Sequence, residues 1–197
     1  VRDPVAAWHR ETGRDFPVTF TTNPVYREGS ILSMYAAKDV LLASDCLVMD
    51  ADVLYHPEVM ARLVRTAHPN CFLLDASSGE TGEEMMVCVR DGQALHIARS
   101  RDASTHEGWD LKGEGVGFFR LAQADAARAL ACIERVVEAG GRDADYERAL
   151  ALLMKETVCG FERVDDLPWT EVDFSEDVAR AESEILPAIR ELLGATA

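Results

Sequence analysis

The stretch CLVMDADVLYHPEVM, residues 46–60, decides how the rest of the chain is interpreted. Its first four residues form a short continuous apolar run, which is typical of a strand covered on both faces of a sheet. Asp50 and Asp52 come directly after this run, and Pro57 then suits the first turn of a helix. In open α/β sheets, ligands gather beyond the carboxyl ends of the strands. The two aspartates are therefore the first candidate site residues.

Strands and helices are predicted to alternate on both sides of this stretch. Asp91-Gly92 is a hairpin signal between two of the strands, and Pro187 is expected to kink the last helix. Strands are expected at residues 18–22, 71–75, 84–90, 93–99, 113–121, 161–164 (an edge strand) and 169–174. Helices are expected at residues 30–43 with Ser30 as the cap, 57–67, 126–139, around 146–153, and from about 175 onward. This order predicts an α/β fold: one domain over residues 1–197, built as a three-layer α/β/α sandwich around a mostly parallel mixed sheet.

The composition of the 197 residues excludes several classes of partner. The net charge is −15, from 20 basic and 35 acidic residues, whereas a nucleic-acid duplex needs a basic face. No apolar run is long enough to span a membrane, and no export signal is visible. The five cysteines are odd in number and scattered, so we interpret them as reduced core residues. We therefore expect a cytoplasmic protein that binds neither nucleic acid nor membrane.

Paired acids at two places in the chain point to a divalent cation. Asp50 and Asp52 share one side of an extended chain, and their repulsion is costly unless a cation lies beside them. Mg²⁺ prefers one or two carboxylates together with phosphate oxygens and water. Glu171 and Asp173 also alternate within PWTEVDFSED, so both face one side. Two alternatives stay open: Asp52 could cap the next helix or turn, and the acids at 176–177 could stabilise the start of the last helix.

The order of motifs resembles the sugar-phosphate and alcohol-phosphate nucleotidyltransferases. Within that family it is most similar to the cytidylyltransferases that act on phosphocholine, inositol phosphate or small phosphonates. The matching pieces are NPVYREGSILSMYAA, LVMDADVLYHPEVMARLV, LLDASSGETGEEMMV, GEGVGFFRL, YERALALL and LPWTEVDFSEDVARAESEILP. They span nearly the whole chain, and the W-x-E-x-D-x-x-x-D pattern of the last piece is the most specific of them. A bare D-x-D is weak, because many metal-dependent transferases carry one.

The resemblance implies a role for each matched position and a nucleotidyltransferase type of fold, similar to the GT-A variant of the Rossmann architecture. It implies that Asp52 and Asp173 bind Mg²⁺ and are the catalytic pair. It implies nucleotide-binding roles for Asn23, Ser30 and Asp50. It places the head group of the acceptor at Glu84, Glu114, Tyr146, Trp169 and Glu171.

One family feature is missing from this sequence. The family opens with a strand and a Gly-rich, Arg-bearing loop that binds the triphosphate through backbone N–H groups and cations. Nothing of that kind precedes residue 18, so we expect that roughly one N-terminal strand–loop–helix unit is absent. Both a fragment and a protein that has lost this loop are left open. Gly113, Gly115 and Gly117 precede no helix, so we interpret them as close backbone approach or a bulge.

The function expected from these observations is a Mg²⁺-dependent nucleotidyltransferase. It would transfer CMP from CTP to a small phosphorylated alcohol or phosphonate and release pyrophosphate. If the acceptor carries an ammonium group, Glu84, Glu114 and Glu171 could pair with it, and Trp169 could supply a cation–π face. The alternatives are a metal-dependent glycosyltransferase of similar fold that uses a nucleotide sugar, and a non-catalytic module of the same fold. A homodimer is left open.

Overall fold

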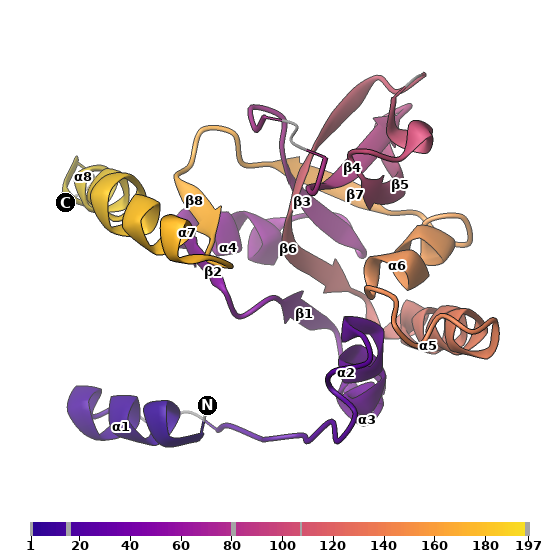
Figure 1. The fold of residues 1–197 in the computed structure, drawn as a ribbon, viewed down its shortest axis with the longest axis horizontal. Coiled ribbons are helices and arrows are strands. Elements are labelled where there is room, and N and C mark those ends of the chain that lie inside the picture. Colours follow the sequence, from indigo (N-terminus) through magenta and orange to yellow (C-terminus); the bar gives the residue numbers. More distant parts are fainter. Residues whose placement is uncertain (1, 15–16, 80–81, 107, 196–197) are drawn as a thin grey trace.

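The computed structural model describes residues 2–14, 17–79, 82–106 and 108–195, and its centre is a six-stranded sheet (Figure 1). A separate two-stranded ribbon lies beside this sheet. The strands of the sheet are β1 (Cys46–Met49), β3 (Cys71–Asp75), β4 (Met85–Arg90), β5 (Gln93–Arg99), β6 (Leu111–Leu121) and β7 (Gly160–Arg163). The ribbon consists of β2 (Val53–Tyr55) and β8 (Trp169–Glu171), which pair antiparallel.

The long strand β6 organises the sheet. It pairs with β3 along one edge, and with β4 and then β1 along the other, and all three pairings are antiparallel. β5 extends the sheet beyond β4, and β7 pairs parallel with β3 at the opposite edge, where an edge strand was predicted. Four strands (β1, β3, β4 and β7) therefore run in one direction. The mixed α/β class is confirmed, but the adjacent pairs are mostly antiparallel rather than parallel, because the reversed strand β6 lies between β3 and the two strands on its other edge.

Helices cover both faces of the sheet, which confirms the three-layer arrangement. The helices are α1 (Arg2–Thr12), α2 (Ser30–Ala36), α3 (Lys38–Ala43), α4 (Pro57–Arg65), α5 (Gln123–Glu138), α6 (Glu147–Leu153), α7 (Ser175–Arg180) and α8 (Leu186–Ala195). Alternate residues of β3 face opposite layers. Phe72 and Leu74 pack into a core with α2, α5 and α6, whereas Cys71 and Leu73 pack against Val59 and Leu63 of α4.

Two breaks in helices have local causes. The helix expected over residues 30–43 divides at Ala37, and its N-cap is Gly29 rather than Ser30. The last helix contains a π-helical turn, Ala181–Ile185, between α7 and α8. Pro187 is the second residue of α8 and cannot donate the backbone hydrogen bond that a regular helix requires. The regular helix is therefore interrupted just before Pro187, and the kink expected there stays a prediction.

The Asp91-Gly92 hairpin also forms as predicted. Asp91 has φ +52° and Gly92 has φ +73°, which are the left-handed conformations of a two-residue hairpin turn. The strands on either side pair from Arg90↔Gln93 to Met85↔Arg99. Local turn chemistry thus agrees with the tertiary pairing.

The N-terminal segment differs from the prediction. Residues 18–22 were expected to form a strand, but they lie in an extended arm that connects α1 to α2 away from the sheet (Figure 1). No neighbouring strand is present beside this arm among the described residues, so its backbone has no ladder to join. The helix α1 was not predicted.

No helix in the described residues is long and apolar enough to cross a bilayer.

Strand β1 is less covered than its apolar sequence suggested. Leu47 is 36% exposed and Met49 is 41% exposed, whereas Cys46 and Val48 are partly buried. Within the described part of the chain, β1 pairs only with β6, along one of its two edges. The expectation of a strand buried on both faces is therefore wrong for β1, whose Leu47 and Met49 remain partly exposed to solvent.

Candidate functional site

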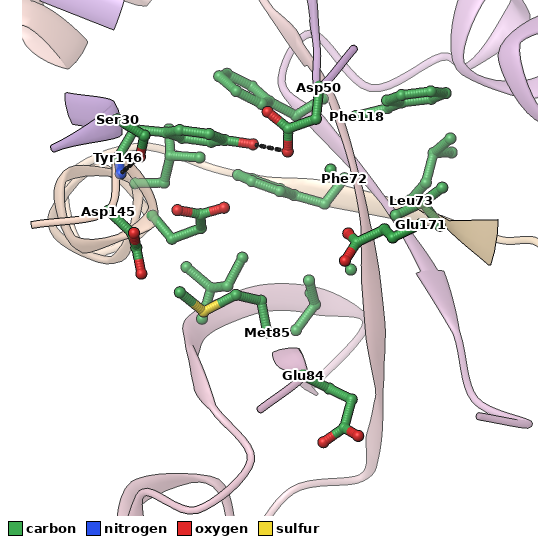
Figure 2. A pocket seen from close by; sticks show the side chains of 18 of the residues that line it. Ser30, Asp50, Phe72, Leu73, Glu84, Met85, Phe118, Asp145, Tyr146 and Glu171 are labelled. Atoms are coloured by element: carbon green, nitrogen blue, oxygen red, sulfur yellow. Dashed lines mark hydrogen bonds between the residues drawn. The ribbon is translucent and has the colours of Figure 1, made fainter. Parts of the chain in front are cut away.

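Two adjoining cavities lie beyond the carboxyl end of β1. The inner cavity, about 270 Å³, is lined from the β1–β2 connection, β3, β4, β6, the start of α6 and the end of β8 (Figure 2). The outer cavity, about 520 Å³, extends toward α7. Both cavities are lined by Glu83, Glu84, Arg99, Glu171 and Asp173. The position agrees with the general rule for ligand sites in α/β sheets.

The two predicted acidic stretches meet at the inner cavity. The ribbon register pairs Val53 with Glu171, and the amide of Val172 donates to the carbonyl oxygen of Asp52 at 2.9 Å. Asp52 and Asp173, which are 121 positions apart in the sequence, therefore lie next to each other across the ribbon, and both line the inner cavity. Among the described residues, no side chain or amide donates a hydrogen bond to either carboxylate. Both are thus available to a cation.

The alternative roles of these acids are also resolved by the geometry. The N-cap of α4 is His56, whose Nδ1 accepts from the amide of Glu58 at 3.1 Å, so Asp52 does not cap that helix. Asp177 does act at the start of α7. Its Oδ2 accepts from the amides of Asp173 at 3.2 Å and of Phe174 at 3.0 Å. Asp177 therefore holds the backbone of Asp173 in place.

Asp50 is held from the side of α6. The hydroxyl of Tyr146 donates to Oδ2 of Asp50 at 2.7 Å, and the amide of Tyr146 donates to Oγ of Ser30 at 3.0 Å. Burial raises the pKa of Asp50, as do Asp52 and Asp173, and the hydrogen bond from Tyr146 opposes this shift. Burial also raises the pKa of Tyr146, which keeps its hydroxyl protonated as a donor.

The predicted nucleotide-binding residues do not all come together. Ser30 and Asp50 line the inner cavity. Asn23 does not, because its amide nitrogen donates to Oγ of Ser33 at 3.0 Å and its carbonyl oxygen accepts from the amide of Val25 at 3.0 Å. In this structure Asn23 holds the turn that leads into α2, and its role in nucleotide binding stays a prediction.

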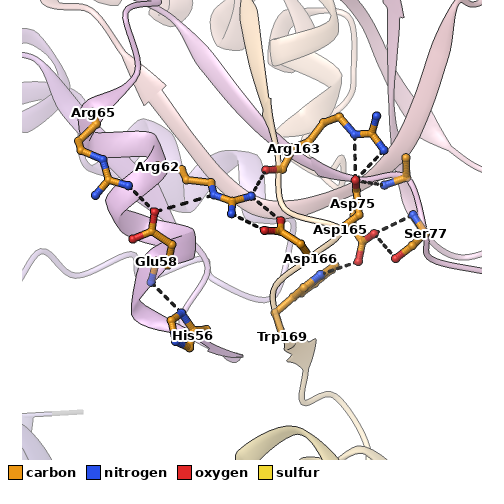
Figure 3. Close-up of polar contacts among 11 residues, drawn as sticks. His56, Glu58, Arg62, Arg65, Asp75, Ser77, Arg163, Asp165, Asp166 and Trp169 are labelled. Carbon is orange, nitrogen blue, oxygen red and sulfur yellow. Dashed lines mark hydrogen bonds and ion pairs between the residues drawn. The ribbon is translucent and has the colours of Figure 1, made fainter. Parts of the chain in front are cut away.

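The predicted head-group residues surround the outer cavity, except Tyr146, which lines the inner one. The indole N–H of Trp169 donates to Oδ2 of Asp75 at 2.9 Å (Figure 3). Asp75 is buried, and its Oδ1 accepts from the amide of Ser77 at 2.7 Å, so the indole is held by a group that is itself fixed. Glu84 accepts from the hydroxyl of Ser100 at 2.6 Å. The indole and the carboxylate therefore have defined positions.

Carboxylates dominate the electrostatics of both cavities. Eight of them line the inner cavity: Asp50, Asp52, Glu83, Glu84, Asp145, Glu147, Glu171 and Asp173. Arg99 is the one cation among the described residues that line the inner cavity, and it already pairs with Asp145 at 2.8 Å. Burial raises the pKa of Glu147, Glu114 and Glu171 to about 7 in each case. Such a site attracts cations and repels an unaccompanied phosphate.

Asp145 lines the inner cavity and was not assigned to the site from sequence. Glu147, the first residue of α6, was a possible residue of the acceptor site because it belongs to the acidic run RDADYE, and it also lines the inner cavity. Gly117 lines the inner cavity with φ +73°. Gly113 and Gly115 approach the backbones of Asp75 and Met85 closely, as expected for glycines that allow close backbone contact.

The side chains present fit Mg²⁺. Asp52 and Asp173 offer hard carboxylate oxygens on a solvent-accessible cavity wall, which is the donor type that Mg²⁺ prefers. The described residues contain no cluster of three or more His, Cys, Asp or Glu side chains arranged to hold a metal. A Mg²⁺ ion held by these two carboxylates would complete its shell with water and substrate oxygens.

The raised pKa of Glu147 predicts a pH-dependent stability. Its pKa in the folded protein, about 7, lies above the ordinary glutamate value, so the folded state favours the neutral form. The free energy of unfolding should fall as the pH rises from about 4.5 through 7. Glu147→Gln should remove this loss and be about 1–3 kcal/mol more stable than the wild type at pH 8, with little difference at pH 4.5.

Urea denaturation at both pH values measures this effect. The exposed Glu138 of α5 offers the matched control, because Glu138→Gln removes one carboxylate from the surface. If Glu147→Gln and Glu138→Gln change the pH dependence equally, Glu147 does not have the raised pKa.

Structural comparison identifies the fold. No protein-family model matches the chain, and no curated protein matches it by sequence. The inositol-1-phosphate CTP transferase from T. maritima superposes with a TM-score of 0.68 at 15% identity, covering 96% of this chain and 73% of that one. The CTP:phosphocholine cytidylyltransferase from Streptococcus pneumoniae superposes with a TM-score of 0.65 at 19% identity, covering 92% and 73%.

A third similar structure is named for a different nucleotide. A protein from Bacillus anthracis that carries the name of a glucose-1-phosphate thymidylyltransferase superposes with a TM-score of 0.65 at 10% identity, covering 92% of this chain and 70% of that one. The chain therefore has the nucleotidyltransferase fold, and the resemblance predicted from its motifs is confirmed at that level. Two of the three similar structures are named as enzymes that use CTP.

Proposed function

We propose that this protein is a Mg²⁺-dependent cytidylyltransferase that transfers CMP from CTP to a small phosphorylated alcohol or phosphonate. The observation that carries the proposal is the convergence of Asp52 and Asp173 on one cavity wall beyond the carboxyl end of β1. The CTP preference is supported by the similar structures that are named for CTP-dependent reactions. Asp52 and Asp173 would hold the Mg²⁺, which when bound supplies positive charge to offset the negative charge of the phosphates.

The proposed reaction needs little from the protein beyond positioning and electrostatics. A phosphate or phosphonate oxygen of the acceptor forms a bond to the α-phosphorus of CTP, and the bond from that phosphorus to the pyrophosphate oxygen breaks in line. No general base is required, because the attacking oxygen is already ionised near neutral pH. Arg99 is the one cation among the described residues of the inner cavity, and its pairing with Asp145 leaves the triphosphate short of cationic partners there. The proposal therefore includes a further cationic segment that binds the triphosphate.

The outer cavity favours an acceptor whose head group is a cation. Glu84, Glu114 and Glu171 line it together with the indole of Trp169, which Asp75 holds in place. Arg180 also lines this cavity, but it already contacts Thr170 and lies 3.6 Å from Asp177. An ammonium group would gain carboxylate partners and an aromatic face at this position. A neutral polyol head group would donate hydrogen bonds to these carboxylates, but it would gain neither charge pairing nor a cation–π contact.

Glu171→Gln tests this head-group assignment. The change keeps the shape of the side chain and removes its charge, so it should raise KM for phosphocholine by about 10- to 100-fold. KM for CTP should change by less than about threefold, since the change removes a contact only to the acceptor. Glu191→Gln, on the exposed face of α8, is the control.

A neutral isostere makes the test independent of the shape of the acceptor. The wild type should prefer phosphocholine over 3,3-dimethylbutyl phosphate, which has the same shape without the charge, and Glu171→Gln should reduce that preference. If Glu171→Gln raises KM for CTP and KM for phosphocholine by the same factor, the head-group assignment is contradicted.

The product separates this reaction from the glycosyltransferase alternative. The purified full-length protein with Mg²⁺, CTP and a panel of phosphorylated and phosphonate acceptors should release pyrophosphate, detected by a coupled phosphate assay after pyrophosphatase treatment. A glycosyltransferase would release a nucleoside diphosphate from a nucleotide sugar instead. Absence of both products, together with absence of CTP binding by calorimetry, would favour a non-catalytic module.

A further inference from the structure

Asp50 and Gly117 approach each other more closely than any other residue type at position 117 would allow. The amide of Asp50 donates to the carbonyl oxygen of Gly117 at 3.1 Å, which extends the β1–β6 ladder by one step. A Cβ at position 117 would lie 2.5 Å from Oδ2 of Asp50 and 3.1 Å from its Cγ. The carboxylate of Asp50 therefore occupies space that exists only because residue 117 has no side chain.

A bulge in β6 brings Gly117 to this position. The β3–β6 register shifts from Phe72↔Phe119 to Leu74↔Gly115, so that three residues of β6 stand opposite one residue of β3. Gly117 is the middle residue of these three, and its φ of +73° is a conformation that favours glycine. Bulges of this kind bend a strand and redirect the groups beside it.

Tyr146 holds the same carboxylate from the opposite element. Its hydroxyl donates to Oδ2 of Asp50 at 2.7 Å (Figure 2), and its side chain is only 8% exposed. Its ring contacts Phe119 with the ring centroids 6.3 Å apart, and its amide is bound by Ser30. Oδ2 is thus held by Tyr146, whereas no donor among the described residues binds Oδ1.

We propose that Gly117 and Tyr146 are positioning residues that fix the Asp50 carboxylate in the inner cavity with Oδ1 directed to the bound nucleotide complex. The proposal rests on the proposed function for the role of Asp50, but the contact itself does not depend on it. A group held by two elements loses little conformational entropy when a ligand arrives, which is the purpose of preorganisation. Without Gly117 or the Tyr146 hydroxyl, Asp50 would rotate away from this orientation.

The contact with Gly117 is tested by thermal unfolding. Gly117→Ala should lower Tm by more than Gly92→Ala, the matched control, which has the same φ of +73° and no atom within 4 Å of its added Cβ. Gly92→Ala should cost about 2–4 °C through backbone strain alone. The change in Tm caused by Asp50→Ala should be measured both in the wild type and in the Gly117→Ala variant. It should be more positive in the Gly117→Ala variant by at least about 3 °C, because removing the carboxylate relieves the clash.

Equal Tm shifts from Asp50→Ala in both backgrounds would overturn the contact. If Gly117→Ala fails to fold, recovery of a cooperative transition in the double variant supports the contact, and failure of that recovery overturns it. These measurements need no activity, so they remain decisive even if the protein releases no pyrophosphate and the proposed function fails.

The role of Tyr146 is tested by a double-mutant cycle on activity. Tyr146→Phe removes only the hydroxyl and should lower kcat/KM for pyrophosphate release by about tenfold, the usual scale for one hydrogen bond to a charged group. In the Asp50→Ala background, Tyr146→Phe should lower kcat/KM by less than about twofold, because the Asp50 carboxylate that the hydroxyl binds is absent. A tenfold loss in both backgrounds would mean that Tyr146 acts directly, and would overturn its positioning role.

Discussion

Asp52→Asn is expected to lower the rate of pyrophosphate release by at least about 100-fold, which is the scale of removing a preorganised electrostatic group from an active site. The change keeps the size of the side chain and removes its charge. Asp52 lies on the wall of the inner cavity, and no described group donates a hydrogen bond to its carboxylate. The fold should therefore survive, and the loss should appear in kcat and in the Mg²⁺ concentration that gives half-maximal rate.

The control for this experiment is Asp39→Asn. Asp39 is exposed in the first turn of α3 and does not line either cavity, so the same chemical change should leave the rate within about twofold of the wild type. Circular dichroism and thermal unfolding of both variants check the fold. A folded Asp52→Asn variant with a near-normal rate would remove Asp52 from the proposed metal site.

Asp173→Asn is expected to cause a loss of similar size, and the two losses should not multiply. Asp52 and Asp173 lie close together across the β2–β8 ribbon and line the same cavity, and we propose that they hold the same cation. Once one carboxylate is neutralised, the cation is already bound weakly, so neutralising the second carboxylate should lower the rate only a little further. The double variant should therefore be no more than about tenfold slower than the slower single variant, whereas independent residues would give about 10⁴-fold in total.

Manganese binding provides a second measurement of this pair. Mn²⁺ is a paramagnetic probe for Mg²⁺ sites, and each single variant should weaken its binding in the presence of CTP by at least about tenfold. Multiplicative losses in activity together with unchanged Mn²⁺ affinity would show that the two aspartates do not share an ion. The control for Asp173 is Asp166→Asn, because Asp166 pairs with Arg62 and lines neither of the two cavities.

The elements with strong local signals were predictable from the sequence. The apolar runs at 46–49 and 71–75 form strands with those bounds, the Asp91-Gly92 turn forms its hairpin, and Pro57 begins a helix. In each case the residues nearby contain the physical cause. The strand expected at 18–22 failed because extended backbone is stabilised by a neighbouring strand, and none is present beside it among the described residues.

The candidate site was predictable in part for the same reason. The four acids at the ends of apolar strands stood out because neighbouring carboxylates repel each other unless a cation lies beside them. All four line the inner cavity: Asp50, Asp52, Glu171 and Asp173. Asn23 was placed at the site through resemblance, whereas its hydrogen bonds hold a local turn. Glu147 was only one possible residue of the acceptor site, and Gly117 was interpreted as part of a bulge or close backbone approach; that both line the inner cavity depends on the assembled fold.

By itself the sequence determined the class of the fold and the acidic character of the site, because periodicity, turn residues and charge are local properties of the chain. Only the tertiary structure decided that β6 runs opposite to its neighbours, and that Asp52 lies beside Asp173. It also decided that Asp50 is held between Tyr146 and Gly117. Those relations join residues 22 to 121 positions apart, and the contacts that select them form only when the sheet, the ribbon and α6 pack together.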